Sequence, residues 1–131
     1  MTSIFNLSYD IPKYVKNATN PNPLTRKEIV KTLIKEGAIN LDNVFTIYHN
    51  HVPTHSVKIA YLVKTTLIFY SSMDKKAIGQ ILSKFANNLY YVLTIVEEEQ
   101  NDYLATIIED QTSQDGFSKE LDEIIEELKR E

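Results

Sequence analysis

Residues 25–48 read TRKEIVKTLIKEGAINLDNVFTIY, and within this stretch a helical pattern gives way to a strand pattern. Thr25 and Glu28 form a capping box, in which each side chain satisfies an orphan backbone donor of the first helical turn. Apolar residues follow at helical spacing, namely Ile29, Val30, Leu33 and Ile34. Gly37 is typical of a helix end. The pattern therefore predicts a helix over residues 25–36.

The segment after this helix is rich in β-branched and aromatic residues, which favour strands. It predicts strands over residues 44–48, 57–63 and 66–70. Whether residues 57–70 form one long strand or a tight hairpin stays open at this level. Pro53 has no N–H to donate to a central ladder, so we place it in the turn between the first two strands.

The second half of the chain predicts two helices separated by two strands. Asp74 is a typical N-cap for a helix over about residues 75–89. Residues 91–96 and 103–108 are predicted to form a hairpin, which the polar residues between them close. Gly116 is interpreted as a break before the last helix.

The predicted order α-β-β-β-α-β-β-α indicates an α+β fold, with an antiparallel or mixed sheet flanked by helices. Residues 24–131 are predicted to form a single domain that ends in an acidic amphipathic helix over residues 118–130. Residues 1–23 carry three of the four prolines and are predicted to form an extended N-terminal arm. Part of this arm is expected to lie on the domain, because it is apolar.

The composition narrows the possible functions. At 131 residues, with 43% hydrophobic and 24% charged residues, the chain has the size and balance of one globular domain. It contains no cysteine, which excludes disulfides, thiolate zinc sites and cysteine nucleophiles. The N-terminus lacks a signal-peptide pattern, and no apolar stretch is long enough for a membrane span. We therefore expect an intracellular, cytoplasmic protein without a membrane partner.

The charges divide unevenly along the chain. Residues 1–91 hold eleven Lys and Arg against five acids, a net charge of +6, whereas residues 92–131 hold three against thirteen, a net charge of −10. Such asymmetry is typical of a basic binding surface, of an acidic segment that modulates it, or of both. The alternative is a mutually neutralising globule in which the acidic end helix packs beside basic strands.

All three histidines, His49, His51 and His55, fall within seven residues. On a strand His49 and His51 share a face. If His55 returns from beyond the turn, the three complete a zinc site of the kind that metal-dependent hydrolases use. The alternative is that they are polar turn residues, since no further ligand stands nearby in the sequence. We expect no metal and no other cofactor.

Other enzyme signatures are missing from the sequence. Three scattered glycines do not build a phosphate-cradling loop, and no Gly-x-Ser-x-Gly nucleophile motif occurs. These absences favour a non-catalytic binding module over an enzyme.

Residues 22–90 resemble a double-stranded RNA-binding domain in the order of their predicted elements. An Asn-Pro pair at residues 22–23 precedes a helix that contains Glu28, and Phe45 stands where the family has its first-strand aromatic. Residues 52–55, Val-Pro-Thr-His, are similar to the Gly-Pro-x-His loop that in this family reaches the minor groove.

Lys75 and Lys76 open the second predicted helix, where the family places a lysine pair against phosphates. The resemblance implies recognition of A-form duplex shape rather than of base sequence. The candidate nucleic-acid-binding residues are Pro53, Thr54, His55, Lys58, Lys75, Lys76 and Lys84. The sequence departs from the family at Val52, which replaces the loop glycine, and at Asp74 and Gly79.

The element order of the whole chain is also similar to the roadblock and longin folds, which serve as dimerising scaffolds. Eight tyrosines suit a protein interface. The tyrosine-rich strands within residues 61–70 and 90–96 are predicted to leave an edge that a second copy covers. The leading prediction is therefore a homodimeric protein-interaction scaffold. Duplex-RNA binding is the alternative. It would be favoured by one continuous basic face around Lys58, Lys64, Lys75, Lys76 and Lys84.

Overall fold

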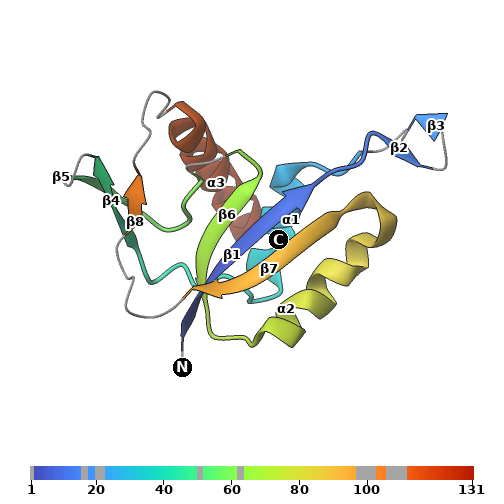
Figure 1. Ribbon diagram of the computed structural model, residues 1–131, viewed down its shortest axis with the longest axis horizontal. Coiled ribbons are helices and arrows are strands. Elements are labelled where there is room, and N and C mark those ends of the chain that lie inside the picture. The colour runs from blue at the N-terminus through green and yellow to red at the C-terminus, as the bar shows by residue number, and fades with distance from the viewer. Residues whose placement is uncertain are drawn as a thin grey trace.

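A three-stranded antiparallel sheet lies at the centre of the computed structural model (Figure 1). Its strand order is β6-β1-β7, with β1 (Ser3–Asp10) between β6 (Thr66–Ser71) and β7 (Tyr90–Val96). The helices are α1 (Arg26–Lys35), α2 (Lys75–Leu82), the 3-10 helix η1 (Ser83–Asn88) and α3 (Thr112–Arg130). The structure describes residues 2–15, 18–19, 23–49, 52–61, 64–96, 103–105 and 112–131. The predicted single-domain α+β fold is confirmed.

Two smaller groups of strands flank the central sheet. The second sheet has the order β5-β4-β8 and consists of β4 (Phe45–His49), β5 (Val52–Val57) and β8 (Tyr103–Ala105). A short hairpin consists of β2 (Tyr14–Val15) and β3 (Ala18–Thr19). Figure 1 shows the second sheet on the left of the molecule and this hairpin at the opposite end.

The position of β1 corrects the prediction that residues 1–23 form an arm. Apolar and polar residues alternate along Ser3–Asp10, so that Phe5, Leu7 and Tyr9 are buried on one face. β1 pairs antiparallel with both β6 and β7, which makes it the central strand of the sheet. The proline-rich composition of the segment obscured this alternation, because its prolines all follow the strand.

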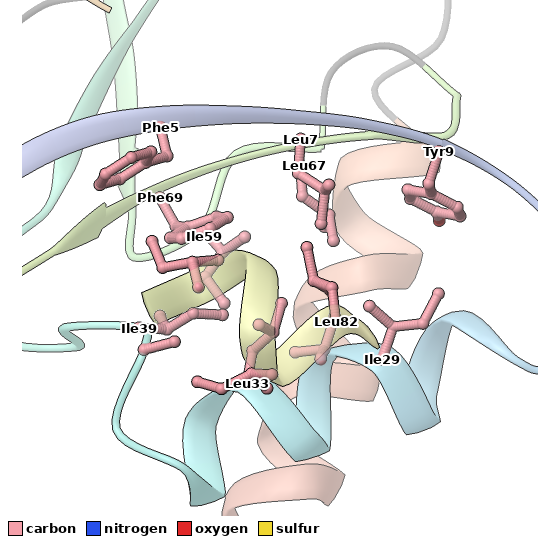
Figure 2. Packing of buried hydrophobic residues seen from close by; sticks show 14 of the residues in the cluster. Phe5, Leu7, Tyr9, Ile29, Leu33, Ile39, Ile59, Leu67, Phe69 and Leu82 are labelled. Atoms are coloured by element: carbon pink, nitrogen blue, oxygen red, sulfur yellow. The ribbon is translucent and has the colours of Figure 1, made fainter. Parts of the chain in front are cut away.

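The main core fills the space between the central sheet and the helices. Figure 2 shows side chains of β1 and β6 pointing toward those of α1 and α2; labelled among them are Phe5, Leu7, Leu67, Phe69, Ile29, Leu33 and Leu82. From α3 the core receives Phe117, Leu121 and Ile124. Burial of one large apolar side chain contributes roughly 1.5–3 kcal/mol, so each of the three helices adds to the stability of this core.

The second sheet packs against the other face of the central sheet and encloses a smaller core. The buried members of this core are Ile4, Phe45, Ile47, Val57, Ala60 and Ile68. The rings of Phe45 and Tyr70 stack with their centroids 4.5 Å apart, and Val96 packs against the same cluster. β4 therefore covers the end of this face that lies near Tyr70 and Val96.

The prediction of a strand over residues 57–63 is wrong in its limits. β5 spans Val52–Val57 and β6 begins at Thr66, so residues 57–70 are not one long strand. Pro53 consequently lies in a strand rather than in a turn. It is tolerated there because β5 is an edge strand, and because the register of β4 and β5 shifts beside it.

The predicted hairpin of residues 91–96 and 103–108 is also wrong. β7 pairs with β1, and β8 lies parallel to β4 in the second sheet. Neighbours in sequence often pair in antiparallel sheets. Here β1 lies beside β7, with buried Leu7 directly opposite Leu93, which packs against the main core.

The two predicted N-caps, Thr25 and Asp74, are confirmed. The side-chain oxygens of Thr25 and Asp74 accept hydrogen bonds from the backbone N–H groups of Glu28 (3.2 Å) and Ala77 (2.7 Å). The end of α1 is also as predicted. Gly37 has a φ of 81°, and the N–H groups after the helix donate to carbonyls of its last turn.

The later helices differ from their predicted lengths. α2 ends at Leu82 and changes to the 3-10 helix, within which Ala86 has a φ of 49°. Gly116 does not break the last helix, since α3 begins at Thr112 and continues through it. An isolated glycine costs a helix only about 1 kcal/mol. The burial of Gln114 and Phe117 on either side of Gly116 offsets that cost.

Candidate protein-interaction surface

The outer edge of β6 is closed by other segments of the chain. Ala60 and Ile68 exchange two backbone hydrogen bonds, of 2.9 and 3.0 Å. The N–H of Asn40 also donates to the carbonyl oxygen of Tyr70, at 2.7 Å. These contacts satisfy the edge of the central sheet internally, as native proteins usually do.

The outer edge of β7 has no such cover within the described part of the chain, where β1 is the only strand beside it. β7 reads YYVLTIV and contains no charged residue, proline or glycine. Its exposed large side chains are Tyr90 (60%), Tyr91 (38%), Val92 (63%) and Ile95 (53%). The outer backbone edge of β7 together with these four side chains is called the β7 edge below. Natural edge strands usually avoid the combination of an open edge, exposed apolar side chains and the absence of charged residues and proline.

The β7 edge presents apolar groups on both faces of the sheet. Tyr91, Leu93 and Ile95 are opposite the inward residues of β1, so they lie on the helix side. There the Tyr91 hydroxyl reaches α2 and lies 3.5 Å from where a Cβ of Gly79 would sit. On the other face lie Tyr90, Val92, Thr94 and Val96.

This arrangement is suited to binding an extended chain. Along an open edge, alternate residues point their N–H and C=O groups outward, where another strand forms main-chain hydrogen bonds with them. Each such bond contributes only about 1 kcal/mol net, because it replaces a bond to water. The exposed apolar side chains add to this by leaving water when a partner strand covers them.

The lysines proposed for nucleic-acid binding do not form one uninterrupted group. Lys75 and Lys76 are exposed in the first turn of α2, and Lys58 is exposed after β5. Lys84 forms an ion pair with Glu36. Lys64 precedes β6 whereas Lys75 follows it, so six strand residues, about 20 Å of chain, separate them.

The remaining sequence-predicted site residues lie in or near β5. Pro53, Thr54 and His55 belong to this strand, where the backbone of His55 is opposite Ile47 and that of Pro53 is opposite Tyr48. The side chains of Thr54 and His55 are outside the described part of the structure.

The hypothesis of a three-histidine metal site falls on residues that the structure does not describe. His51 lies outside the described residues, and of His49 and His55 only the backbone is described. Within the described residues, no group of three or more His, Asp and Glu side chains is placed to hold a metal ion.

The acidic C-terminal helix packs beside bases, but these belong to α1 rather than to strands. Arg26 and Glu120 form an ion pair, with the Arg26 Nε 2.7 Å from the carboxylate. Further along the two helices the nitrogen–oxygen distances are 3.0 Å for Lys27–Glu127, 3.4 Å for Lys31–Glu131 and 3.2 Å for Lys35–Glu131. Part of the charge asymmetry is thus neutralised between α1 and α3.

We expect these ion pairs to make folding stability depend on pH. The hydrogen bond from Lys27 lowers the pKa of Glu127, and the hydrogen bond from Lys35 lowers the pKa of Glu131, below the ordinary 4.5. A carboxylate whose pKa is lowered in the folded state stabilises that state above pH 4.5. This contribution is lost as the pH falls through the folded-state pKa.

Denaturant unfolding at pH 7 and pH 3 in low salt measures this dependence. The natural protein is expected to lose more stability on acidification than the Glu127→Gln/Glu131→Gln variant. Added salt at pH 7 should bring the two proteins closer together, because both pairs are solvent-exposed. Equal losses in the two proteins would show that the pairs contribute nothing to the pH dependence.

A partly buried polar cluster joins the start of β6 to β1 and α1. The hydroxyl of Tyr61 accepts a hydrogen bond from the N–H of Thr65 (3.0 Å), and the Arg26 guanidinium lies 4.6 Å from the Tyr61 ring centroid. Burial opposes ionisation of Tyr61, but Thr65, Tyr9 and Arg26 together outweigh it and lower its pKa. Burial, followed by the hydrogen bond and charge of Tyr61, raises the pKa of Tyr9. The cluster holds Thr65 at a φ of 61°, which indicates a structural role in this turn.

The sequence predicts an unpaired edge at residues 61–70 or 90–96, and the structure has the open edge at β7. The run of seven uncharged residues at 90–96 was predicted to contribute an open edge, and it does so among the described residues. The other candidate, within residues 61–70, does not have an open edge, because the bridge between Ala60 and Ile68 closes it. The contacts that close the β6 edge come from Asn40 and Ala60, which lie outside both strands.

No protein-family model, curated protein or solved structure matches this chain. None of the helices in the described part of the chain is both long enough and apolar enough to cross a membrane. The function has to follow from the residues themselves.

Proposed function

We propose that this protein is a non-catalytic interaction module that binds an extended strand of a protein partner along the β7 edge. One observation carries the proposal. The protein closes the β6 edge of its sheet with its own backbone, but it leaves four large apolar side chains exposed along β7. Strand addition supplies main-chain hydrogen bonds, and the side chains on the two faces supply apolar contacts.

A peptide strand tests this function. A labelled peptide with the sequence of β7, flanked by lysines for solubility, is expected to bind the protein and raise the fluorescence anisotropy of the label. Val92→Lys places a charge on the β7 edge and is expected to weaken binding about tenfold or more, which corresponds to ~1.4 kcal/mol. Tyr14→Lys is the matched control, since Tyr14 is 64% exposed but lies in β2. If neither the peptide nor a second copy binds this edge, the proposal is wrong.

Duplex-RNA recognition has less support from the described residues. Two observations stand against a continuous basic face: the ion pair of Lys84 with Glu36, and the separation of Lys64 from Lys75 by the length of β6. We expect no measurable affinity for duplex RNA at low salt. Salt-dependent binding that Lys75→Ala/Lys76→Ala weakens, with a slope reduced by about one unit per lost contact, would favour this function instead.

A further inference from the structure

The geometry of antiparallel pairing limits the registers in which the β7 edge is able to pair with a second copy of β7. In a regular antiparallel ladder, two directly opposed residues have the same hydrogen-bonding role. When a strand pairs with its own copy, one residue must therefore lie directly opposite the same residue of the copy. The two-fold axis then passes midway between these two residues. Centring β7 on Leu93 pairs all seven residues of Tyr90–Val96. Centring it on either neighbour shortens the paired segment by two residues.

The pairs made by this register are all between uncharged residues. Tyr90 is opposite Val96 of the copy and Tyr91 is opposite Ile95, while Val92 is opposite Thr94. Each tyrosine thus meets a β-branched residue, which is one of the preferred cross-strand combinations. Because β7 contains no charged residue, no like charges become opposed. An uncharged strand also has no charge pattern by which to select a charged partner.

We propose that the occupant of the β7 edge is β7 of a second copy, paired antiparallel about a two-fold axis at Leu93, so that the two central sheets become one six-stranded sheet. This inference rests on the proposed function, whose partner it identifies. A single strand pair is a small interface, so the association is expected in the micromolar range, of the order of −8 kcal/mol. Light scattering at about 100 μM is expected to give the mass of a dimer.

Cysteine cross-linking tests the register, because the natural chain contains no cysteine. Val92 of one copy lies directly opposite Thr94 of the other, with Cα atoms about 4.5–5.5 Å apart, a separation that a disulfide spans. Two Val92 residues, or two Thr94 residues, are diagonal neighbours about 7–8 Å apart, which is beyond that reach. Both positions are exposed, so single cysteines are tolerated there.

An oxidised mixture of Val92→Cys and Thr94→Cys proteins is therefore expected to contain mainly the mixed disulfide by mass spectrometry. Each variant alone should cross-link no more than the control Tyr14→Cys, and circular dichroism should show all three folded. A dimer that cross-links all combinations equally, or none, would overturn the proposed pairing. A monomer at 100 μM that binds the β7 peptide would overturn self-pairing but leave strand binding intact. A monomer that does not bind the peptide would overturn both.

Discussion

Phe5→Ala is expected to destabilise the domain by about 3–5 kcal/mol, the usual cost of removing a buried phenylalanine ring. Phe5 is 1% exposed, and its ring stacks on that of Phe69 with centroids 6.0 Å apart. The strand that carries it is hydrogen-bonded on both sides, so loss of the ring leaves a cavity in the middle of the main core.

Tyr14→Ala is the matched control for this prediction. Tyr14 belongs to the same N-terminal segment but is exposed, so its replacement is expected to change stability by less than about 0.5 kcal/mol. Urea unfolding at neutral pH measures both variants. Similar small effects of the two substitutions would mean that residues 1–23 are an arm after all, and that the domain folds without them.

Phe117→Ala is expected to have an effect of the same size, about 3–5 kcal/mol, although the residue lies at the other end of the chain. Phe117 is fully buried, its ring stacks on Tyr61 at 5.2 Å, and the Arg26 guanidinium lies 5.2 Å from its centroid. Truncation removes the ring from the core and also exposes the ion pair that Arg26 makes with Glu120.

The shape of the unfolding curve matters as much as its midpoint for this variant. If α3 is part of the core, Phe117→Ala shifts one cooperative transition, and tyrosine fluorescence and circular dichroism change together. Lys119→Ala, an exposed position of the same helix, should leave that transition in place. Two separate transitions in the natural protein would show that α3 is an appendage.

Local signals of the sequence predicted local structure well. The caps at Thr25 and Asp74 and the glycine after α1 were all recognisable, because each depends on hydrogen bonds within a few residues. Errors arose where distant contacts decide. Pro53 indicates a turn in isolation, but an edge position lets it remain in β5. Gly116 indicates a break in isolation, but the burial of its neighbours keeps it in α3.

The open edge of the central sheet was also predictable only in part. The absence of charge in residues 90–96 is visible in the sequence, and it sets this strand apart from ordinary edge strands. Whether an edge is open depends on what lies beside it. The closing contacts at Asn40 and Ala60 come from loops whose positions only the folded chain defines. Sequence reasoning therefore found the strand without being able to choose between two edges.

The central place of β1 also governs when the protein is able to fold. β1 pairs with residues 58 to 68 positions away in β6 and 80 to 92 positions away in β7. Pairing between residues so far apart in the sequence slows folding, because the entropy of closing long loops is lost before the strand contacts form. During synthesis, β1 leaves the ribosome long before either neighbour exists, and the sheet is incomplete until β7 has followed. Until then the apolar face of β1 stays uncovered, so we expect the unfinished chain to be more prone to aggregate than the folded protein.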